Sequence, residues 1–201
     1  MAELIKDVSA EQDGTQVAVQ IHDLRKKYFN SEEPIVLEQN MDQDPFIQFD
    51  KWFKNVAAQT EMSFEEVNAV NIATCVNNKP SSRMVLLKEY SSQGFTFYTN
   101  SVSKKGQDLN INPNAAMLFY WPKVDRQIRI EGVVSVQDDQ IALNYWNKRP
   151  LASRISNMLS EQSSVVPSRQ YLEDKKLELE KLAKEHGAAA ITKPKHGLDT
   201  P

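Results

Sequence analysis

The chain has 201 residues, of which 40% are hydrophobic and 25% are charged, so its size favours one domain with one sizeable core. Its net charge of -3 gives no general attraction to nucleic acid or to an anionic membrane, so any basic site must be local. One cysteine and three widely separated histidines offer no metal-ligand spacing, and we expect no metal.

The N-terminal segment shows no targeting signal. It lacks the apolar core of a signal peptide, and no stretch of the chain is long enough to span a membrane. We therefore expect a cytoplasmic protein without membrane contact. Residues 1–20 are polar and aperiodic, which predicts a disordered arm. The basic cluster Arg25-Lys26-Lys27 that follows is, taken alone, a solvated run of charges.

A helix-start signal stands at Asp44-Pro45, where a capping side chain precedes a proline at the first helical position. The aromatic and apolar residues that follow recur at helical spacing: Phe46, Phe49, Trp52, Phe53 and Val56. We predict an amphipathic helix whose aromatic stripe packs in the core and does not bind a cofactor.

Strand patterns dominate the middle of the chain. They cover 69–76, 81–90, 94–99, 115–121 and 127–136, and short turns such as Asn77-Asn78 join them. Consecutive strands with short connections predict an antiparallel meander or barrel. The break between 101 and 113 reads as a short helix with Ser101 or Ser103 as its N-cap.

After residue 138 the apolar spacing becomes helical. One helix contains Ile141 to Trp146 and is ended by Pro150, and a second short helix begins near Ser153. Residues 168–186 form a charged helix with a thin apolar stripe and Gly187 as C-cap. Residues 187–201 show no pattern, and we predict a disordered tail.

Cations stand at both ends of the strand pattern 83–88. Strand alternation places Arg83 and Lys88 on opposite faces unless a bulge intervenes, roughly 16 Å apart. On this segment alone, charged strand ends in water and the two ends of an extended ligand explain the pattern equally well. Lys104 and Lys105 favour a ligand, because lysine at a helix start is unfavourable unless an anion binds there.

Further polar groups follow on later elements. Gln127 belongs to a polar row on one strand face, which reads either as a solvent-facing row or as a contact to the edge of a ring. Tyr145, Arg149 and the helix start at Ser153 combine the donors of a phosphate pocket, and Gln162-Ser163 adds more. Together these groups indicate two anionic ligands.

Several of these segments resemble one known family, the FMN-dependent pyridoxine/pyridoxamine 5'-phosphate oxidases. The resemblance runs from about Leu24 to Leu182. The matching motifs are Arg-Met-Val-Leu-Leu-Lys at 83–88, Phe-Tyr-Thr-Asn at 97–100, Ser-Lys-Lys at 103–105, Phe-Tyr-Trp at 119–121, Arg-Gln-Ile-Arg-Ile-Glu-Gly at 126–132, Tyr-Trp-Asn-Lys-Arg-Pro at 145–150 and Glu-Gln-Ser-Ser at 161–164.

The resemblance implies an α+β fold that is mainly antiparallel β: an FMN-binding split β-barrel with flanking helices, here at 21–186, that forms a homodimer with each flavin between two subunits. The residues implied to bind FMN are Arg83, Met84, Val85, Leu86, Leu87, Tyr98, Thr99, Lys104, Lys105, Gln127, Gln162 and Ser163. Those implied to bind the substrate are Lys88, Tyr145, Arg149 and Ser153, with Arg25, Lys26, Lys27 and Tyr28 closing over it from the arm.

The implied reaction oxidises pyridoxamine or pyridoxine 5'-phosphate to pyridoxal 5'-phosphate. A hydride passes from C4' to the flavin, and O2 reoxidises the flavin to give H2O2. No catalytic side chain is assigned, because the flavin carries the electrons while the protein positions and polarises.

The sequence also departs from the family. Members continue with Trp-Gly-Gly, Glu-Phe-Trp-Gln-Gly and Arg-Leu-His-Asp-Arg segments and a strand ending in Leu-Ala-Pro, and none of these occurs here. We expect a barrel that is incomplete at its C-terminal end, with an open sheet edge and exposed apolar surface. The alternative function is a catalytically inactive chain that binds FMN or pyridoxal phosphate, or that dimerises with a full-length copy. Nucleic-acid binding is the least favoured interpretation.

Overall fold

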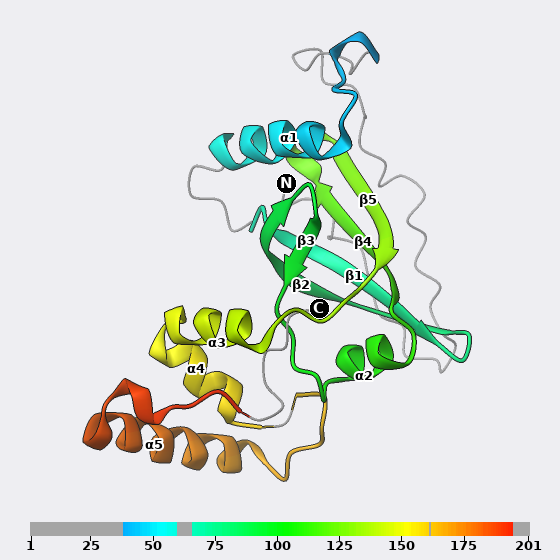
Figure 1. Cartoon of the computed structure of the whole chain (residues 1–201). Helices are drawn as coiled ribbons and strands as arrows, with labels where there is room; N and C mark the ends of the chain where they lie inside the picture. The colour runs from blue at the N-terminus through cyan, green and yellow to red at the C-terminus, as the bar shows by residue number, and fades with distance from the viewer. Residues whose placement is uncertain (1–37, 60–65, 161, 195–201) are drawn as a thin grey trace, which may run out of the picture. The chain divides into compact units, whose positions relative to one another are not determined.

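A computed structural model describes residues 38–59, 66–160 and 162–194 of the chain (Figure 1). The predicted arm at 1–20 and the predicted substrate-binding residues 25–28 lie outside the described residues. The helices are α1 (Pro45–Gln59), α2 (Lys104–Ile111), α3 (Asp139–Lys148), α4 (Leu151–Met158) and α5 (Arg169–His186), with 3-10 turns at Glu38–Asn40, Pro122–Val124 and Ala188–Ala190. The strands are β1 (Ala69–Val76), β2 (Lys79–Ser91), β3 (Gly94–Phe97), β4 (Asn114–Trp121) and β5 (Arg126–Val133).

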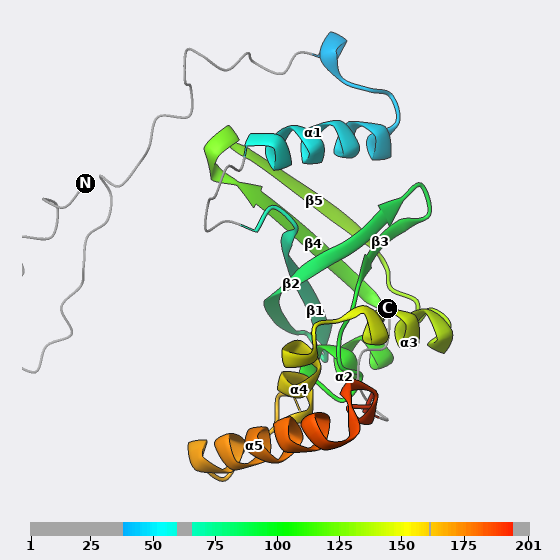
Figure 2. The same cartoon turned by 90° about the vertical axis from the view of Figure 1, so that its left-hand side faces the viewer.

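The strands form one antiparallel sheet in the order β3-β2-β1-β4-β5, and the sheet curls into a half-barrel (Figures 1 and 2). This confirms the mainly antiparallel α+β architecture. α1 lies across one end of the half-barrel and α2 lies at the other end, while α3, α4 and α5 form a group beside α2. Each predicted strand is present, and the differences are confined to strand ends.

Two strands are shorter than predicted. The strand expected at 94–99 ends at Phe97, since Tyr98 leaves the ladder and its ring stacks on Tyr145 of α3. The strand expected at 127–136 ends at Val133, and the next amide donates to the Pro113 carbonyl at 2.8 Å. β2 begins two residues earlier than predicted, directly after the predicted turn at Asn77-Asn78, where φ angles of 51° and 61° suit a tight hairpin.

The aromatic stripe of α1 is core, as predicted. Asp44 Oδ1 accepts a hydrogen bond from the Phe46 amide at 2.7 Å, which caps the helix start. Phe49 is 3% exposed, and its ring contacts rings on β2, β3 and β4, including Tyr90, Phe95 and Phe119. These contacts close one end of the half-barrel around the buried inner faces of the strands.

The short helix α2 begins where predicted, and Ser103 is the N-cap: its side chain accepts from the Gly106 amide. Gly106 is required here for close approach. A Cβ at this position would collide with the backbone oxygens of Asn100 and Ser101. The first turn of α2 is therefore pressed against the segment that follows β3.

The helices α3, α4 and α5 share a second core with residues beyond α5. α3 ends before Pro150 as predicted, but α4 starts at Leu151, so Ser153 lies within its first turn. The prediction of a disordered tail is wrong for 188–194. Ala188–Ala190 form a 3-10 turn, and Ile191 is completely buried and accepts from Trp146 Nε1 at 3.2 Å. The alanines and Ile191 carry no periodic pattern, which explains why the sequence does not predict this contact.

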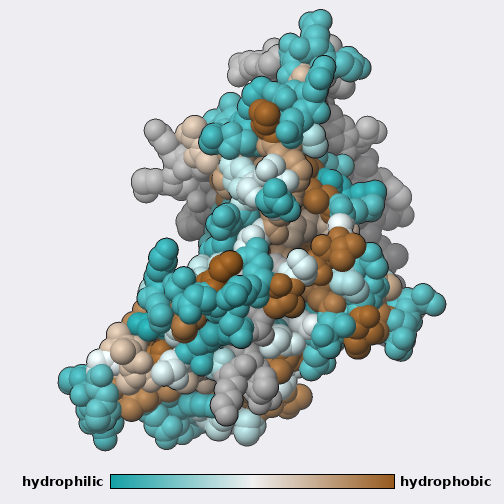
Figure 3. All heavy atoms as spheres, viewed as in Figure 1, coloured by the Kyte–Doolittle hydropathy of each residue, from teal (hydrophilic) through white to brown (hydrophobic). Residues whose placement is uncertain are grey.

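Within the described ranges, β3 and β5 are the two edge strands of the sheet. A groove of about 550 Å³ lies between them, with apolar walls that include Phe95, Met117 and Ile130. Figure 3 has the same view as Figure 1 and shows apolar residues at the centre of this face. We call this feature the edge groove. None of the helices in the described ranges is both long and apolar enough to cross a membrane.

Candidate functional site

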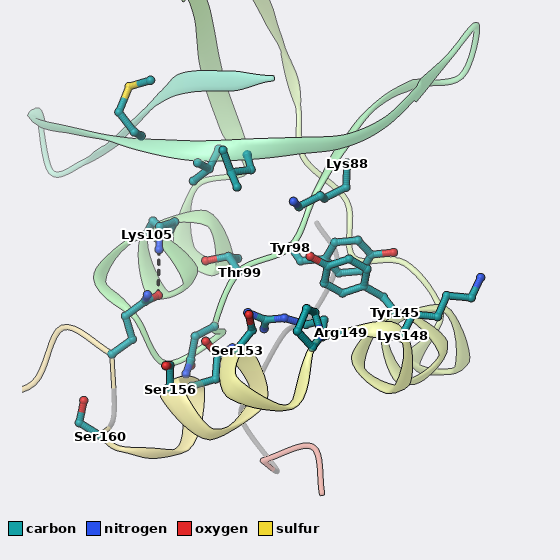
Figure 4. A pocket seen from close by; sticks show the side chains of 17 residues that line it. Lys88, Tyr98, Thr99, Lys105, Tyr145, Lys148, Arg149, Ser153, Ser156 and Ser160 are labelled. Carbon is teal, nitrogen blue, oxygen red and sulfur yellow. Dashed lines mark hydrogen bonds between the residues drawn. The ribbon is translucent and has the colours of Figure 1, made fainter. Parts of the chain in front are cut away.

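A second cavity of about 550 Å³ lies between β2, the segment after β3, and the helices α2, α3 and α4 (Figure 4). We call it the polar pocket. Its lining residues are Met84, Val85, Leu86, Lys88, Tyr98, Thr99, Asn100, Lys105, Tyr145, Lys148, Arg149, Pro150, Ser153, Ser156, Asn157, Ser160 and Gln162. Eleven of the twenty residues predicted from the sequence to bind a ligand are thus brought to one place by elements far apart in the chain.

β2 forms one wall of the polar pocket with the face that points away from the barrel interior. Met84 and Leu86 lie on this face, and Lys88 follows them, exposed and directed into the pocket (Figure 4). The pairing with β3 shifts register between Leu87 and Glu89, so a bulge lies at Lys88. Arg83 pairs with Ile72 on the opposite, inward face, which confirms that the two predicted cations face opposite sides.

The segment after β3 contributes Tyr98 and Thr99. Thr99 is 7% exposed, and its Oγ1 has no hydrogen-bond partner in the described part of the chain. The Tyr98 ring stacks on Tyr145 of α3 with 3.7 Å between ring centroids and 3° between planes. Burial raises the pKa of Tyr98, and the nearby carboxylate of Glu89 raises it further, so its hydroxyl stays protonated.

Lys105 is the cation that α2 places in the polar pocket. It is 8% exposed, and its Nζ donates to Gln162 Oε1 at 3.0 Å and to Ser103 Oγ at 3.4 Å (Figure 4). Burial lowers the pKa of Lys105, and the positive charge of Arg83 lowers it further. A buried ammonium whose partners among the described residues are neutral oxygens provides strong attraction for an anion.

α3 and α4 supply a second group of donors. The Arg149 guanidinium lies 5.8 Å from the Tyr145 ring centroid and 5.9 Å from that of Trp146. Its Nη1 is buried and finds no hydrogen-bond partner among the described residues. Burial lowers the pKa of Arg149. Ser153 lies in the first turn of α4, whose N-cap Pro150 makes no side-chain capping bond. Amide donors at a helix start, a hydroxyl and a guanidinium suit a phosphate.

Some predicted residues lie outside the polar pocket. Leu87 is in the barrel core at 3% exposure, and Arg83 and Lys104 bind side chains beyond the pocket wall. Gln127 is exposed on β5, three strands away from β2. Ser163 follows Gln162, with a φ of 72°, and does not line the pocket.

Sequence reasoning missed Lys148, Ser156, Asn157 and Ser160, which also line the pocket. Ser153, Ser156 and Ser160 recur at helical spacing, so a polar stripe was present in the sequence. This stripe was missed because the helix that contains it was identified by its apolar residues. Asp108, which binds Lys104 beside the pocket, was missed because an isolated aspartate on a short helix carries no signal.

The donor set of the polar pocket fits FMN and a phosphorylated substrate. Lys105 and the unpartnered Thr99 Oγ1 lie at one side, and Lys88, Tyr145 and Arg149 lie at the other (Figure 4). Two separate groups of donors suit two anionic ligands. A curled antiparallel half-barrel with such a pocket on its outer wall defines a split-barrel protein, and the donors of the pocket suit phosphorylated ligands.

Comparisons with known proteins specify the family. The family model described as pyridoxamine 5'-phosphate oxidase matches residues 57–182. A Caenorhabditis elegans protein that carries the same oxidase name is 55% identical over 179 residues, covering 88% of this chain and 79% of that protein. The pyridoxine-5'-phosphate oxidase of Bos taurus is 39% identical over 180 residues, covering 89% and 67%. The chain belongs to the pyridoxamine 5'-phosphate oxidase family, which is a family of oxidoreductases.

Solved structures share the fold. PhzG from Burkholderia lata 383, in complex with tetrahydrophenazine-1-carboxylic acid, has a TM-score of 0.73 at 22% identity and covers 83% of this chain and 80% of its own. A pyridoxamine 5'-phosphate oxidase-related, FMN-binding protein from Nostoc punctiforme has a TM-score of 0.57 at 14% identity, covering 80% of each chain. The split-barrel fold predicted from the sequence is thereby confirmed.

Proposed function

We propose that this chain is an FMN-dependent oxidase that converts pyridoxamine or pyridoxine 5'-phosphate to pyridoxal 5'-phosphate, with O2 as electron acceptor and H2O2 as product. The observation that carries the proposal is the polar pocket, in which two separate sets of donors suited to phosphate face one cavity. Family membership and the names of the relatives support the substrate class.

In this proposal the cofactor phosphate lies near Lys105, Gln162 and Thr99. Lys105 supplies a buried positive charge, Thr99 Oγ1 gains the partner it lacks, and Met84 and Leu86 offer an apolar wall to a flat ring. The flavin, when bound, supplies the electron-accepting chemistry. The remaining residues that we propose for FMN are Arg83, Val85, Leu87, Tyr98, Lys104, Gln127 and Ser163.

The substrate phosphate is proposed to bind Tyr145, Arg149 and Ser153, with Lys88 opposite them on β2. Arg149 would satisfy its buried Nη1 on a phosphate oxygen, and Ser153 adds a hydroxyl at the start of α4. The stacked ring of Tyr98 holds Tyr145 in place. The role of these residues is to bind and orient the substrate beside the cofactor and to keep water out.

We also propose a homodimer in which each site receives residues from both chains. Cross-strand pairing places Met84, Leu118 and Arg129 in one row on the outer sheet face, and Tyr120 lies opposite Gln127 on the same face. Met84, Leu118 and Tyr120 are 61%, 38% and 65% exposed, an apolar surface that suits a partner. Gln127, roughly 14 Å across the sheet from β2, would then reach the polar pocket of the second copy.

The test is direct. The purified chain is expected to be yellow, to release FMN on denaturation, and to consume O2 when pyridoxamine 5'-phosphate is added. No turnover at saturating FMN would overturn the oxidase assignment. Retained flavin without turnover would favour the alternative of an inactive chain that binds FMN. Co-purification with a full-length homologue whose activity is altered would favour the alternative of a chain that dimerises with the full-length copy.

A further inference from the structure

Asp108 on α2 is a buried carboxylate beside the polar pocket, with 4% of its surface exposed. Its Oδ1 accepts a hydrogen bond from Lys104 Nζ at 2.6 Å, and its Oδ2 accepts from Thr74 Oγ1 at 2.7 Å. Arg83 Nη2 lies 3.9 Å from the same Oδ2. The hydrogen bond from Lys104, more than any other contact, lowers the pKa of Asp108, so the carboxylate is ionised at neutral pH.

Thr74 links Asp108 to Arg83. Its Oγ1 accepts from Arg83 Nη1 at 3.0 Å while it donates to the carboxylate. The guanidinium also donates to the Ile72 carbonyl at 3.3 Å and to Ser81 Oγ at 2.6 Å. Arg83 is therefore held on the inner side of the sheet end by neutral oxygens, with the Asp108 carboxylate 3.9 Å away.

Among the described residues of this region, the cations outnumber the carboxylates. Arg83, Lys104 and Lys105 carry three positive charges, Asp108 carries one negative charge, and the excess is two. Arg83 and Lys105 lie close enough for each charge to affect the other, and among the described residues no carboxylate pairs with Lys105. A phosphate monoester carries about -1.5 to -2 at pH 7, which is about the charge that would neutralise this excess.

We propose that Asp108 is the internal counter-ion of the cofactor-phosphate site. Its one negative charge lowers the net charge of the three cations from +3 to +2, which a single phosphate dianion would neutralise. The inference rests on the proposed FMN function and adds a residue that none of the motifs contains. In the flavin-free chain the carboxylate offsets repulsion among Arg83, Lys104 and Lys105. In the complex it moderates their attraction for the ligand.

The proposal predicts opposite effects of Asp108→Asn on the stability of the flavin-free chain and on its affinity for a phosphorylated ligand. Asp108→Asn keeps the size of the side chain and an oxygen that accepts from Thr74, but it raises the excess to three. The flavin-free chain then loses stability because its cations repel one another without compensation. A phosphorylated ligand, in contrast, is attracted more strongly. A residue that only shapes the site would weaken both the fold and the ligand affinity.

The experiment compares FMN with riboflavin, which lacks the phosphate, by titration of flavin fluorescence into flavin-free protein. For Asp108→Asn we expect the ratio of riboflavin to FMN dissociation constants to rise about threefold or more. Lys104→Gln, at a side chain that is 58% exposed, should lower the ratio. The double variant restores an excess of two and should restore the wild-type ratio. Asp174→Asn on the exposed face of α5 is the matched control and should change nothing.

Thermal unfolding of the flavin-free proteins gives a second readout. The midpoint of Asp108→Asn should be lower than that of the wild type, and inorganic phosphate should raise it by more than it raises the wild-type midpoint. An unchanged or lower riboflavin-to-FMN ratio in Asp108→Asn overturns the proposal, and so does a double variant that fails to restore it. If Asp108→Asn does not fold, an unchanged ratio in Lys104→Gln overturns it.

The two proposals fail in different ways. A wild-type chain that binds neither flavin overturns the FMN assignment. The phosphate measurement then decides the role of Asp108. A larger rise in midpoint for Asp108→Asn than for the wild type still supports the counter-ion, and an equal rise overturns it.

Discussion

Thr99 Oγ1 and Arg149 Nη1 are buried donors without hydrogen-bond partners in the part of the chain that the structure describes, and both residues line the polar pocket. A buried polar group that is left unsatisfied costs about 1–3 kcal/mol. If either residue served only to fill space in an apolar core, a hydrophobic side chain would fill it at lower cost. The two atoms are therefore the positions at which we expect a polar ligand to bind.

Arg149→Ala tests the substrate side of the pocket. It should weaken binding of pyridoxal 5'-phosphate about 10- to 100-fold, because a hydrogen bond to a charged group contributes about 1.5–3 kcal/mol. FMN affinity should stay within about twofold, since Lys105 and Thr99, which we propose for the FMN phosphate, lie at the other side. The measurement is a pair of titrations, one per ligand.

Arg149→Lys and Arg169→Ala are the controls for this substitution. The lysine keeps the charge without the planar fork and should give an intermediate loss. Arg169 is an exposed arginine on α5 and should have no effect. Equal loss of both ligands in Arg149→Ala would contradict the assignment of separate sites.

Gly106→Ala tests the close approach between α2 and the segment after β3. A Cβ would collide with the oxygens of Asn100 and Ser101, and backbone atoms cannot rotate away, so we expect a loss of about 1–3 kcal/mol in the free energy of unfolding. Urea denaturation measures it. The matched control is Gly132→Ala on β5, where a Cβ meets nothing within 4 Å and no loss is expected. Equal destabilisation by both would show that the tight contact is unimportant.

At the scale of elements, local signals set most of the fold. Asp44 with Pro45 begins α1, Asn77-Asn78 makes the β1–β2 hairpin, and Ser103 begins α2, each through chemistry that a few neighbouring residues carry. The burial of Ile191 was missed because it depends on Trp146, 45 residues away, and no local sequence pattern predicts it. Tyr98 leaves its strand for a similar long-range reason.

Ile191→Ala should destabilise the helix group. The side chain is completely buried beside Trp146, so its truncation should cost about 2–4 kcal/mol of unfolding free energy. The control is Ile111→Ala at the end of α2, where the same side chain is 68% exposed and should matter little. Chemical denaturation followed by tryptophan fluorescence compares them. Near-wild-type stability of Ile191→Ala would contradict the packing of residues 188–194 and favour the predicted disordered tail.

At the scale of the whole molecule, the sequence predicts many residues of the site but not how they come together. The donors at Lys88, Lys105 and Arg149 follow from charge in unusual places along strands and helix starts. Their convergence depends on how the sheet curls and how α3 and α4 pack, which no single segment encodes. Gln127 shows the limit, because it shares the outer face with Met84 but lies across the sheet from the pocket.

Leu118→Glu tests the proposed dimer. Leu118 is 38% exposed at the middle of the outer sheet face, and a carboxylate there would be desolvated on association, a cost that its cross-strand neighbour Arg129, already paired with Glu131, offsets only in part. We expect the dimer dissociation constant to rise about 30-fold or more, as measured by sedimentation equilibrium. Ile47→Glu, on an exposed position of α1, is the control and should leave the dimer intact. A wild-type chain that is monomeric at all concentrations would exclude this interface.

The chain has two separate hydrophobic cores, one inside the half-barrel and one among α3, α4 and α5. The polar pocket lies where the two groups of elements face each other, and the hydrogen bond from Lys105 to Gln162 crosses it. A ligand in that position would fasten one core to the other. In hydrogen-exchange experiments, amides of the helical core should therefore exchange through a lower-energy opening than those of the barrel, and FMN should slow the helical amides most.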